Sequence, residues 1–179
     1  ILILGATGFL GSELAVSLMK QKYDVTLVGR SLKKTTPKII KENIIQTEIE
    51  SLSGYSLGDF DVVINCISII DEMNYNFEDI FYSNCFVLYK IFNILSFKKI
   101  IHISTYSIFS NSFEKNSVPN PQSYYGISKH VSEKISLIEG GNKTIILRFP
   151  IIIGKNKNSP DIVGYIYDNL SKNKRIKIY

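Results

Sequence analysis

The chain of 179 residues is 45% apolar and carries a formal net charge of +5, which suits one domain with a sizeable core rather than two. Its longest apolar runs fall far short of the roughly 18 residues of a membrane span, and it holds no nucleic-acid recognition module or stripe of interleaved aromatic and basic residues. We therefore expect a cytoplasmic protein with no membrane or nucleic-acid partner, whose basic residues face solvent or a small anionic ligand.

The ends of the chain and its two cysteines add to these expectations about the kind of protein. The chain opens without Met inside an apolar run and stops within a stretch that resembles a short strand, so we expect a fragment of a longer protein. Cys66 and Cys85 lie in apolar segments with neither disulfide nor metal spacing. This favours core positions in a reducing compartment and predicts no metal site.

Short apolar runs alternate along the chain with longer segments of helical period, which is typical of βαβ units around a parallel sheet buried on both faces. We expect strands at Ile1–Leu4, Val25–Val28, Asn43–Ile45, Asp61–Cys66, Lys99–Ser104 and Thr144–Phe149. We expect helices at Phe9–Lys20, Ile80–Phe97, Tyr124–Ile138 and Ile162–Ser171, and a loop at Asn111–Pro121. The prediction is a single α/β domain over residues 1–179, with ligands bound at the carboxyl ends of the strands.

The first predicted strand is followed by "GATGFLG", with glycines three residues apart and a helix behind them. Small residues there let the backbone turn tightly and approach a pyrophosphate at the helix N-terminus. We favour dinucleotide binding over a purely structural turn, because the motif lies between a strand and a helix. The expected cofactor-binding residues of this loop are Gly5, Thr7, Gly8, Phe9, Leu10 and Gly11.

The second predicted strand ends in "LVGRS" and lacks the acidic residue that usually binds the adenosine ribose. Arg30 stands in its place, followed by Ser31. Because a guanidinium group matches a phosphate with several directed N–H groups, we expect NADP as the cofactor, with NAD as the alternative. Arg30 as an ordinary surface charge is the competing interpretation.

With "YYGISK" at 124–129, the chain resembles the extended short-chain dehydrogenase/reductase family, particularly its sugar-nucleotide epimerases, dehydratases and reductases. The family's motifs occur in order: the glycine loop, Glu48, "DVVINCIS", "HISTYSIF", Tyr125-x-x-x-Lys129 and "LRFPIIIG". The resemblance implies a Rossmann-type doubly wound sheet that carries the cofactor. It also implies a smaller C-terminal part that helps to hold a sugar nucleotide and lies mostly beyond Tyr179.

The resemblance implies further cofactor contacts. Asn65 and the residues after it would line the cofactor at the end of the fourth strand, although a strand end with incidental polar groups is the simpler interpretation. Asn84 falls where family members often carry a structurally important Asn, and a plain helix-surface residue is the alternative. The implied contacts are Glu48 and Ile49 near the adenine, Cys66, Ile67 and Ser68 after the fourth strand, and Pro150 and Ile151 near the nicotinamide.

Two adjacent tyrosines compete for the chemistry, and helical spacing separates them. Tyr125 and Lys129 are four residues apart and share a helix face, whereas Tyr124 pairs with the uncharged Ser128. A nearby ammonium group favours the phenolate and lowers a phenol's pKa, so we expect Tyr125 to act as general acid or base. Lys129 would also hold the nicotinamide ribose.

The third catalytic group is a hydroxyl from the end of the fifth strand. Thr105 is the candidate, with Ser104 as the alternative. His102 alternates with apolar strand residues, so we expect a core or edge histidine rather than a base.

We therefore hypothesise an NADP-dependent oxidoreductase that acts on a sugar nucleotide, as a ketoreductase or as an epimerase or dehydratase with transient oxidation. The alternative from another class is a non-catalytic NADP-binding regulatory protein, since a fold alone does not define a function. Family members often dimerise through helices that correspond to Ile80–Phe97 and Tyr124–Ile138, so a homodimer is also considered.

Overall fold

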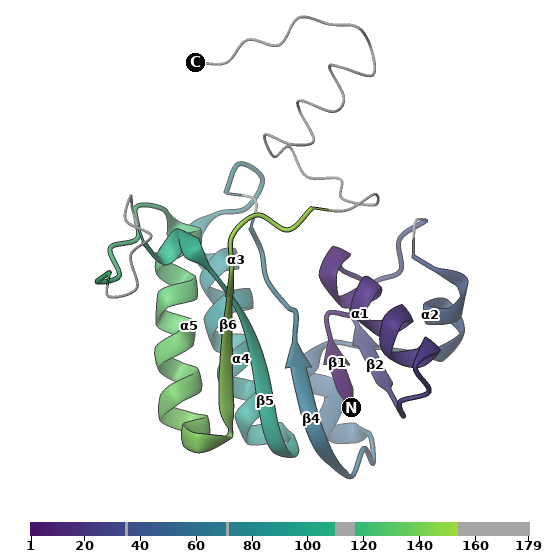
Figure 1. The fold of residues 1–179 in the computed structure, drawn as a ribbon. Coiled ribbons are helices and arrows are strands. Elements are labelled where there is room, and N and C mark those ends of the chain that lie inside the picture. The colour runs from purple at the N-terminus through teal and green to yellow at the C-terminus, as the bar shows by residue number, and fades with distance from the viewer. Residues whose placement is uncertain (35, 71, 110–116, 154–179) are drawn as a thin grey trace, which may run out of the picture.

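The computed structural model describes residues 1–34, 36–70, 72–109 and 117–153. Six parallel strands form one sheet in the order β3-β2-β1-β4-β5-β6, which confirms the predicted Rossmann-type sheet (Figure 1). The strands are β1 (Leu2–Leu4), β2 (Thr26–Gly29), β3 (Ile44–Gln46), β4 (Asp59–Asn65), β5 (Ser96–Thr105) and β6 (Thr144–Phe149). The chain builds outwards from β1 in one direction and then from β4 in the other. The switch point therefore lies between β1 and β4.

Helices lie on both faces of the sheet (Figure 1), although Ile145 and Leu147 near its β6 edge stay exposed in the described part of the chain. The α-helices are α1 (Phe9–Lys20), α2 (Lys38–Asn43), α3 (Phe77–Phe81), α4 (Val87–Ile94) and α5 (Tyr124–Gly140). A π-helical turn, η2 (Tyr82–Phe86), joins α3 to α4, and short 3₁₀ turns lie at η1 (Ile49–Gly54), η3 (Tyr106–Ile108) and η4 (Gly141–Lys143).

Two core clusters lie on opposite faces of the sheet, as the period of two along each strand requires. One contains Ile3, Leu27 and Ile64 and packs against α1 and α2. The other contains Leu4, Val63 and Ile100 and packs against α4. A sheet buried between helix layers in this way leaves the carboxyl ends of its strands as the edge at which side chains can meet a ligand.

The helix predictions are confirmed for α1 and corrected elsewhere. The helix predicted at Ile80–Phe97 runs from Phe77 to Ile94, because the Asn76 side chain accepts from the Asp79 N–H and because Leu95 is already extended. The helix α5 continues two residues past the predicted Ile138 and ends before Gly141, whose φ is 50°. The predicted helix Ile162–Ser171 and most of the predicted loop Asn111–Pro121 lie outside the described residues.

The short helix α2 was not predicted, because six residues are too few for a helical period to be recognised. Among the described residues, no helix combines the length and the apolar character that crossing a bilayer requires.

Candidate functional site

The glycine loop forms a tight turn between β1 and α1. Gly5 has a φ of 75°, a conformation that residues with a side chain rarely adopt, and its carbonyl oxygen accepts from the Gly8 N–H at 2.9 Å. A Cβ atom on Gly11 would collide with the Gly5 carbonyl oxygen, so α1 can approach the turn only with glycine there. The first turn of α1 begins at Phe9 and leaves backbone N–H groups without partners inside the helix.

The turn lies against the end of β4, at the switch point of the sheet. The Cys66 N–H donates to the Leu4 carbonyl oxygen at 3.0 Å, and a Cβ on Gly5 would lie 3.0 Å from the carbonyl carbon of Cys66. The buried Asn65 accepts from the Ile67 N–H at 3.1 Å and so shapes the turn that follows the strand. Cys66, Ile67 and Ser68 are half-buried, and the first two lie against Gly5 of the glycine loop.

The ends of β2 and β3 lie together on the other side of the loop. The Thr47 N–H donates to the Gly29 carbonyl oxygen at 3.1 Å. Arg30 is exposed directly after β2, and it makes no ion pair with any residue in the described part of the chain. Glu48 is also exposed, whereas Ile49 is 5% exposed and packs in the core. Of this expected adenine-contacting pair, only Glu48 presents its side chain to solvent.

Tyr125 and Lys129 lie on one face of α5, as their spacing predicts. The helix begins at Tyr124 because the Ser123 side chain accepts from the Gly126 N–H, and the Glu72 carboxylate accepts from the Tyr125 N–H. A Cβ on Gly126 would lie 2.5 Å from the Ser107 carbonyl oxygen. This glycine therefore lets α5 approach the end of β5, where the candidate hydroxyl groups are.

The end of β5 distinguishes the two candidate hydroxyls. Ser104 donates to Glu133 at 2.6 Å and is buried inside the interface between β5 and α5. Thr105 instead lies beside the Tyr125 phenol, as does Ser68. Burial raises the pKa of Tyr125 above its ordinary value, and the hydroxyls of Thr105 and Ser68 act against that shift. The net rise differs from the expected fall, because burial outweighs every neighbouring group.

Lys129 is 1% exposed, and burial lowers its pKa from 10.5 to about 8. Cys85, Glu133 and Cys66 act in the opposite direction when they are ionised. Burial raises the pKa of Cys85 to about 11 and that of Cys66 to about 12, so neither thiol carries a charge at neutral pH. An ammonium group in such a position is costly to the fold, and a strongly perturbed lysine at the carboxyl edge of a sheet is typical of a functional site.

Asn84 and Tyr124 also have defined places. The Asn84 side chain accepts from the Ile69 N–H at 2.8 Å and donates to the Ile69 carbonyl oxygen at 2.9 Å and to Ser128 at 2.9 Å. It is therefore a buried structural residue that ties the loop after β4 to α5, and not a helix-surface residue. Tyr124 is 54% exposed and packs edge-on against Phe77.

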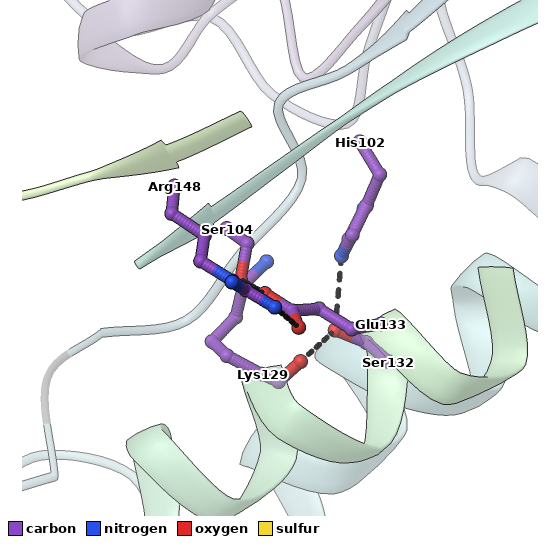
Figure 2. Close-up of polar contacts among 6 residues, drawn as sticks. All are labelled: His102, Ser104, Lys129, Ser132, Glu133 and Arg148. Atoms are coloured by element: carbon purple, nitrogen blue, oxygen red, sulfur yellow. Dashed lines mark hydrogen bonds and ion pairs between the residues drawn. The ribbon is translucent and has the colours of Figure 1, made fainter. Parts of the chain in front are cut away.

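Sequence reasoning missed a buried polar cluster behind the tyrosine and lysine. His102 is buried, as expected, and its Nε2 lies 2.9 Å from the Ser132 hydroxyl. Glu133 forms a bidentate ion pair with Arg148 (Figure 2). The one available signal was spacing, since Glu133 lies four residues after Lys129 and eight after Tyr125, on the same helix face.

The fold and the glycine turn define a Rossmann-type dinucleotide-binding domain. Residues 1–179 match the model of the NAD dependent epimerase/dehydratase family, and the chain belongs to this family. No curated protein matches the chain.

Solved structures of this family share the fold at low sequence identity. The UDP-glucuronic acid 4-epimerase of Bacillus cereus in complex with NAD is 24% identical over 97% of this chain and 62% of its own, with a TM-score of 0.82. A hypothetical dTDP-4-dehydrorhamnose reductase from Sulfolobus tokodaii is 24% identical over 98% of this chain and 63% of its own, with a TM-score of 0.74. MoeE5, in complex with UDP-glucose and NAD, is 17% identical over 99% of this chain and 63% of its own, with a TM-score of 0.75. The chain thus spans less than two thirds of each of these proteins.

Proposed function

We propose that the chain is the cofactor-binding domain of an NAD(P)-dependent oxidoreductase that acts on a sugar nucleotide. The observation that carries the proposal is the buried Lys129 one helical turn after Tyr125, with the Thr105 hydroxyl beside the phenol. A structural role alone would not require an ammonium group in a site where burial disfavours its charge.

The residues around the switch point fit a dinucleotide. Glycine at positions 5 and 11 keeps the turn tight, and a Cβ on Gly8 would meet only the Gly5 carbonyl oxygen within 4 Å, so the space beside it is open. Bound there, NAD(P) supplies reversible hydride transfer. The residues that we assign to its binding are Gly5, Thr7, Gly8, Phe9, Leu10, Gly11, Arg30, Ser31, Glu48, Ile49, Cys66, Ile67, Ser68, Tyr125, Lys129, Pro150 and Ile151.

In this assignment Tyr125 moves the proton. Its raised pKa keeps the phenol protonated at neutral pH, so it can donate to a carbonyl oxygen that is being reduced. Thr105 donates a hydrogen bond to the same oxygen and holds the substrate in position. Lys129, and the positive charge of an oxidised nicotinamide, would favour the phenolate that accepts the proton when an alcohol is oxidised.

We further propose a preference for NADP. The exposed Arg30 directly follows β2 and has no ion-pair partner in the described part of the chain, which supports its use in binding an adenosine 2′-phosphate. The UDP-glucuronic acid 4-epimerase and MoeE5 structures both contain NAD, which makes NAD the competing cofactor.

The family and the similar solved structures support a proposal for the substrate class. UDP-glucuronic acid and UDP-glucose are bound in two of the similar structures, and a third is a hypothetical dTDP-4-dehydrorhamnose reductase. We infer a sugar nucleotide, and ketoreductase, epimerase and dehydratase remain the candidate reactions. We also infer a cytoplasmic enzyme, in line with its unpaired cysteines, and a homodimer built through α4 and α5.

The experiment is a cofactor balance with the full-length protein and a panel of UDP- and dTDP-linked sugars and ketosugars. Loss of one NADPH per product indicates a ketoreductase, and product without net cofactor loss indicates an epimerase or dehydratase. Cofactor binding with no turnover on any member of the panel would contradict the proposal and favour a regulatory NADP-binding protein.

A further inference from the structure

The helix α5 buries a polar face, which is unusual. A helix that covers a sheet normally turns apolar side chains towards it. The buried residues of α5 are all polar or glycine: Gly126, Ser128, Lys129, Ser132, Glu133, Ser136 and Gly140. A buried polar face is costly unless each group is paired, so its partners indicate what it is for.

Glu133 is the most completely bonded member of this face. Its Oε1 accepts from the Ser104 hydroxyl at 2.6 Å and from Arg148 Nε at 2.8 Å, and its Oε2 accepts from Arg148 Nη2 at 2.8 Å (Figure 2). The residue is 3% exposed. Three donor atoms surround this carboxylate, and two of them belong to the guanidinium group of Arg148. The charge is thus fixed between β5, α5 and β6.

Glu133 lies one helical turn after Lys129, and its charge favours the ammonium form of that lysine against burial. The other titratable groups around the ammonium are two thiols, an imidazole and a phenol: Cys66, Cys85, His102 and Tyr125. Burial raises the pKa of the two thiols to about 12 and about 11 and lowers that of the imidazole well below 6.5. The phenol's pKa is raised as well, so all four are neutral at pH 7. Among the described groups that act on Lys129, Glu133 is therefore the one whose negative charge can offset the burial of the lysine.

A second polar chain fixes the backbone next to Lys129. Ser132 donates to the Lys129 carbonyl oxygen at 2.8 Å, and the Ser132 hydroxyl lies 2.9 Å from His102 Nε2. Since Ser132 uses its only hydrogen on that carbonyl, His102 donates from Nε2, and its Nδ1 accepts from Asn65 at 3.4 Å. A neutral histidine with this tautomer satisfies the chain without adding charge beside the ammonium group.

We propose that Glu133 is a positioning residue for the proposed active site: its carboxylate, fixed by Arg148 and Ser104, supplies the negative charge that keeps the buried Lys129 in its ammonium form. The inference rests on the proposed function for its catalytic meaning. The expected effect of Glu133 on the pKa of Lys129 does not depend on a substrate. Arg148 shares the carboxylate and so limits how strongly Glu133 acts on Lys129.

The test is a direct titration of Lys129 by NMR in full-length protein labelled with ¹³C at the lysine Cε, with the resonance assigned from Lys129→Met. Glu133→Gln keeps the size of the side chain and removes its charge, so the pKa of Lys129 should fall by about one unit or more. Glu139→Gln, an exposed carboxylate on the same helix, is the matched control and should leave that pKa unchanged. No substrate or turnover enters this measurement, so its outcome is separate from that of the cofactor balance.

A second variant tests the proposal if Glu133→Gln does not fold. Arg148→Met removes the cation that shares the carboxylate, so the pKa of Lys129 should rise, opposite to the effect of Glu133→Gln. If the contacts of Glu133 only stabilise the fold, both variants should have a lower melting temperature and an unchanged Lys129 pKa. A Lys129 pKa that stays within about 0.3 units of wild type in the folded variants would overturn the proposal.

Discussion

At the scale of one residue, the buried Lys129 of the candidate site lowers the stability of the fold. Its ammonium group is buried, and its pKa falls from 10.5 to about 8 on folding. The unfolded chain therefore holds the proton more tightly than the folded one. The resulting penalty is absent above pH 10.5, develops as the pH falls towards 8, and is complete below that value.

Replacement of Lys129 by Met should therefore stabilise the protein while it removes the proposed activity. We expect the free energy of unfolding at pH 7 to rise by roughly 1–3 kcal/mol and the gain to shrink at pH 10. Urea denaturation at the two pH values measures this difference. Lys134→Met, at an exposed position on the same helix, is the control. A variant that is less stable than wild type at pH 7 would contradict the lowered pKa.

Arg30 carries the second prediction at this scale. A guanidinium hydrogen bond to a phosphate contributes about 1.5–3 kcal/mol, so Arg30→Ala should weaken NADP binding by roughly 10-fold to 100-fold and leave NAD binding nearly unchanged. Fluorescence titration of both cofactors gives the ratio, with Lys20→Ala at the far end of α1 as the control. An unchanged ratio would show that Arg30 is an ordinary surface charge.

Some residues could be assigned from the sequence and others could not, for physical reasons. Tyr125 and Lys129 follow from helical spacing, which is local. Ser104 and Thr105 are adjacent, and only contacts with α5 show that Ser104 bonds to Glu133 whereas Thr105 lies beside the Tyr125 phenol. Burial of Ile49 and the bonds of Asn84 likewise depend on packing between elements far apart in the chain.

At the scale of elements, the turn between β1 and α1 depends on close contact between backbones. Gly11 is the first-turn residue of α1 that faces the Gly5 carbonyl oxygen, and no flexible side chain is there to yield. Gly54, at the end of η1, has nothing within 4 Å of an added Cβ. The two positions therefore form a matched pair for testing the turn.

We expect Gly11→Ala to push α1 away from the turn, with the loss of most cofactor affinity and a fall in stability of roughly 1–3 kcal/mol. Gly54→Ala should change neither quantity by more than about 0.5 kcal/mol. Cofactor titration and thermal unfolding of the two variants measure both effects. Equal behaviour of the pair would mean that the turn tolerates a wider separation than its geometry indicates.

Element boundaries were predictable only where one pattern ended clearly. Apolar runs located all six strands, and helical period gave the bounds of α1. The strand bounds were less exact, since β4 runs from Asp59 to Asn65 instead of Asp61–Cys66 and β5 from Ser96 to Thr105 instead of Lys99–Ser104. The end of α4 did not follow from either pattern, because apolar residues continue through Leu95 and Phe97 into β5 and period alone cannot separate a helix from the strand behind it. The π-helical turn at Tyr82–Phe86, which contains the buried Asn84 and Cys85, carries no recognisable signal in the sequence.

At the scale of the whole molecule, the order β3-β2-β1-β4-β5-β6 brings distant segments to one edge of the sheet (Figure 1). The glycine turn follows β1, Ser68 follows β4, Thr105 ends β5, and Tyr125 lies in the first turn of α5. Parallel topology could be predicted from the alternation of strands and helices, and with it the shared edge. The register of the strands determines which side chains meet at that edge. The proposed chemistry requires the arrangement of side chains that results.

The pair Tyr125→Phe and Tyr124→Phe, assayed in the full-length enzyme on the substrate found by the cofactor balance, tests that arrangement most directly. Removal of the Tyr125 hydroxyl should lower kcat by about 10²-fold to 10⁴-fold while most cofactor affinity persists, because the proton donor is lost whereas the aromatic ring and the other residues assigned to cofactor binding remain. Removal of the exposed Tyr124 hydroxyl should change kcat by less than about threefold, because that residue packs against Phe77 through its ring. Equal losses in the two variants, or full activity in Tyr125→Phe, would contradict the proton-transfer role.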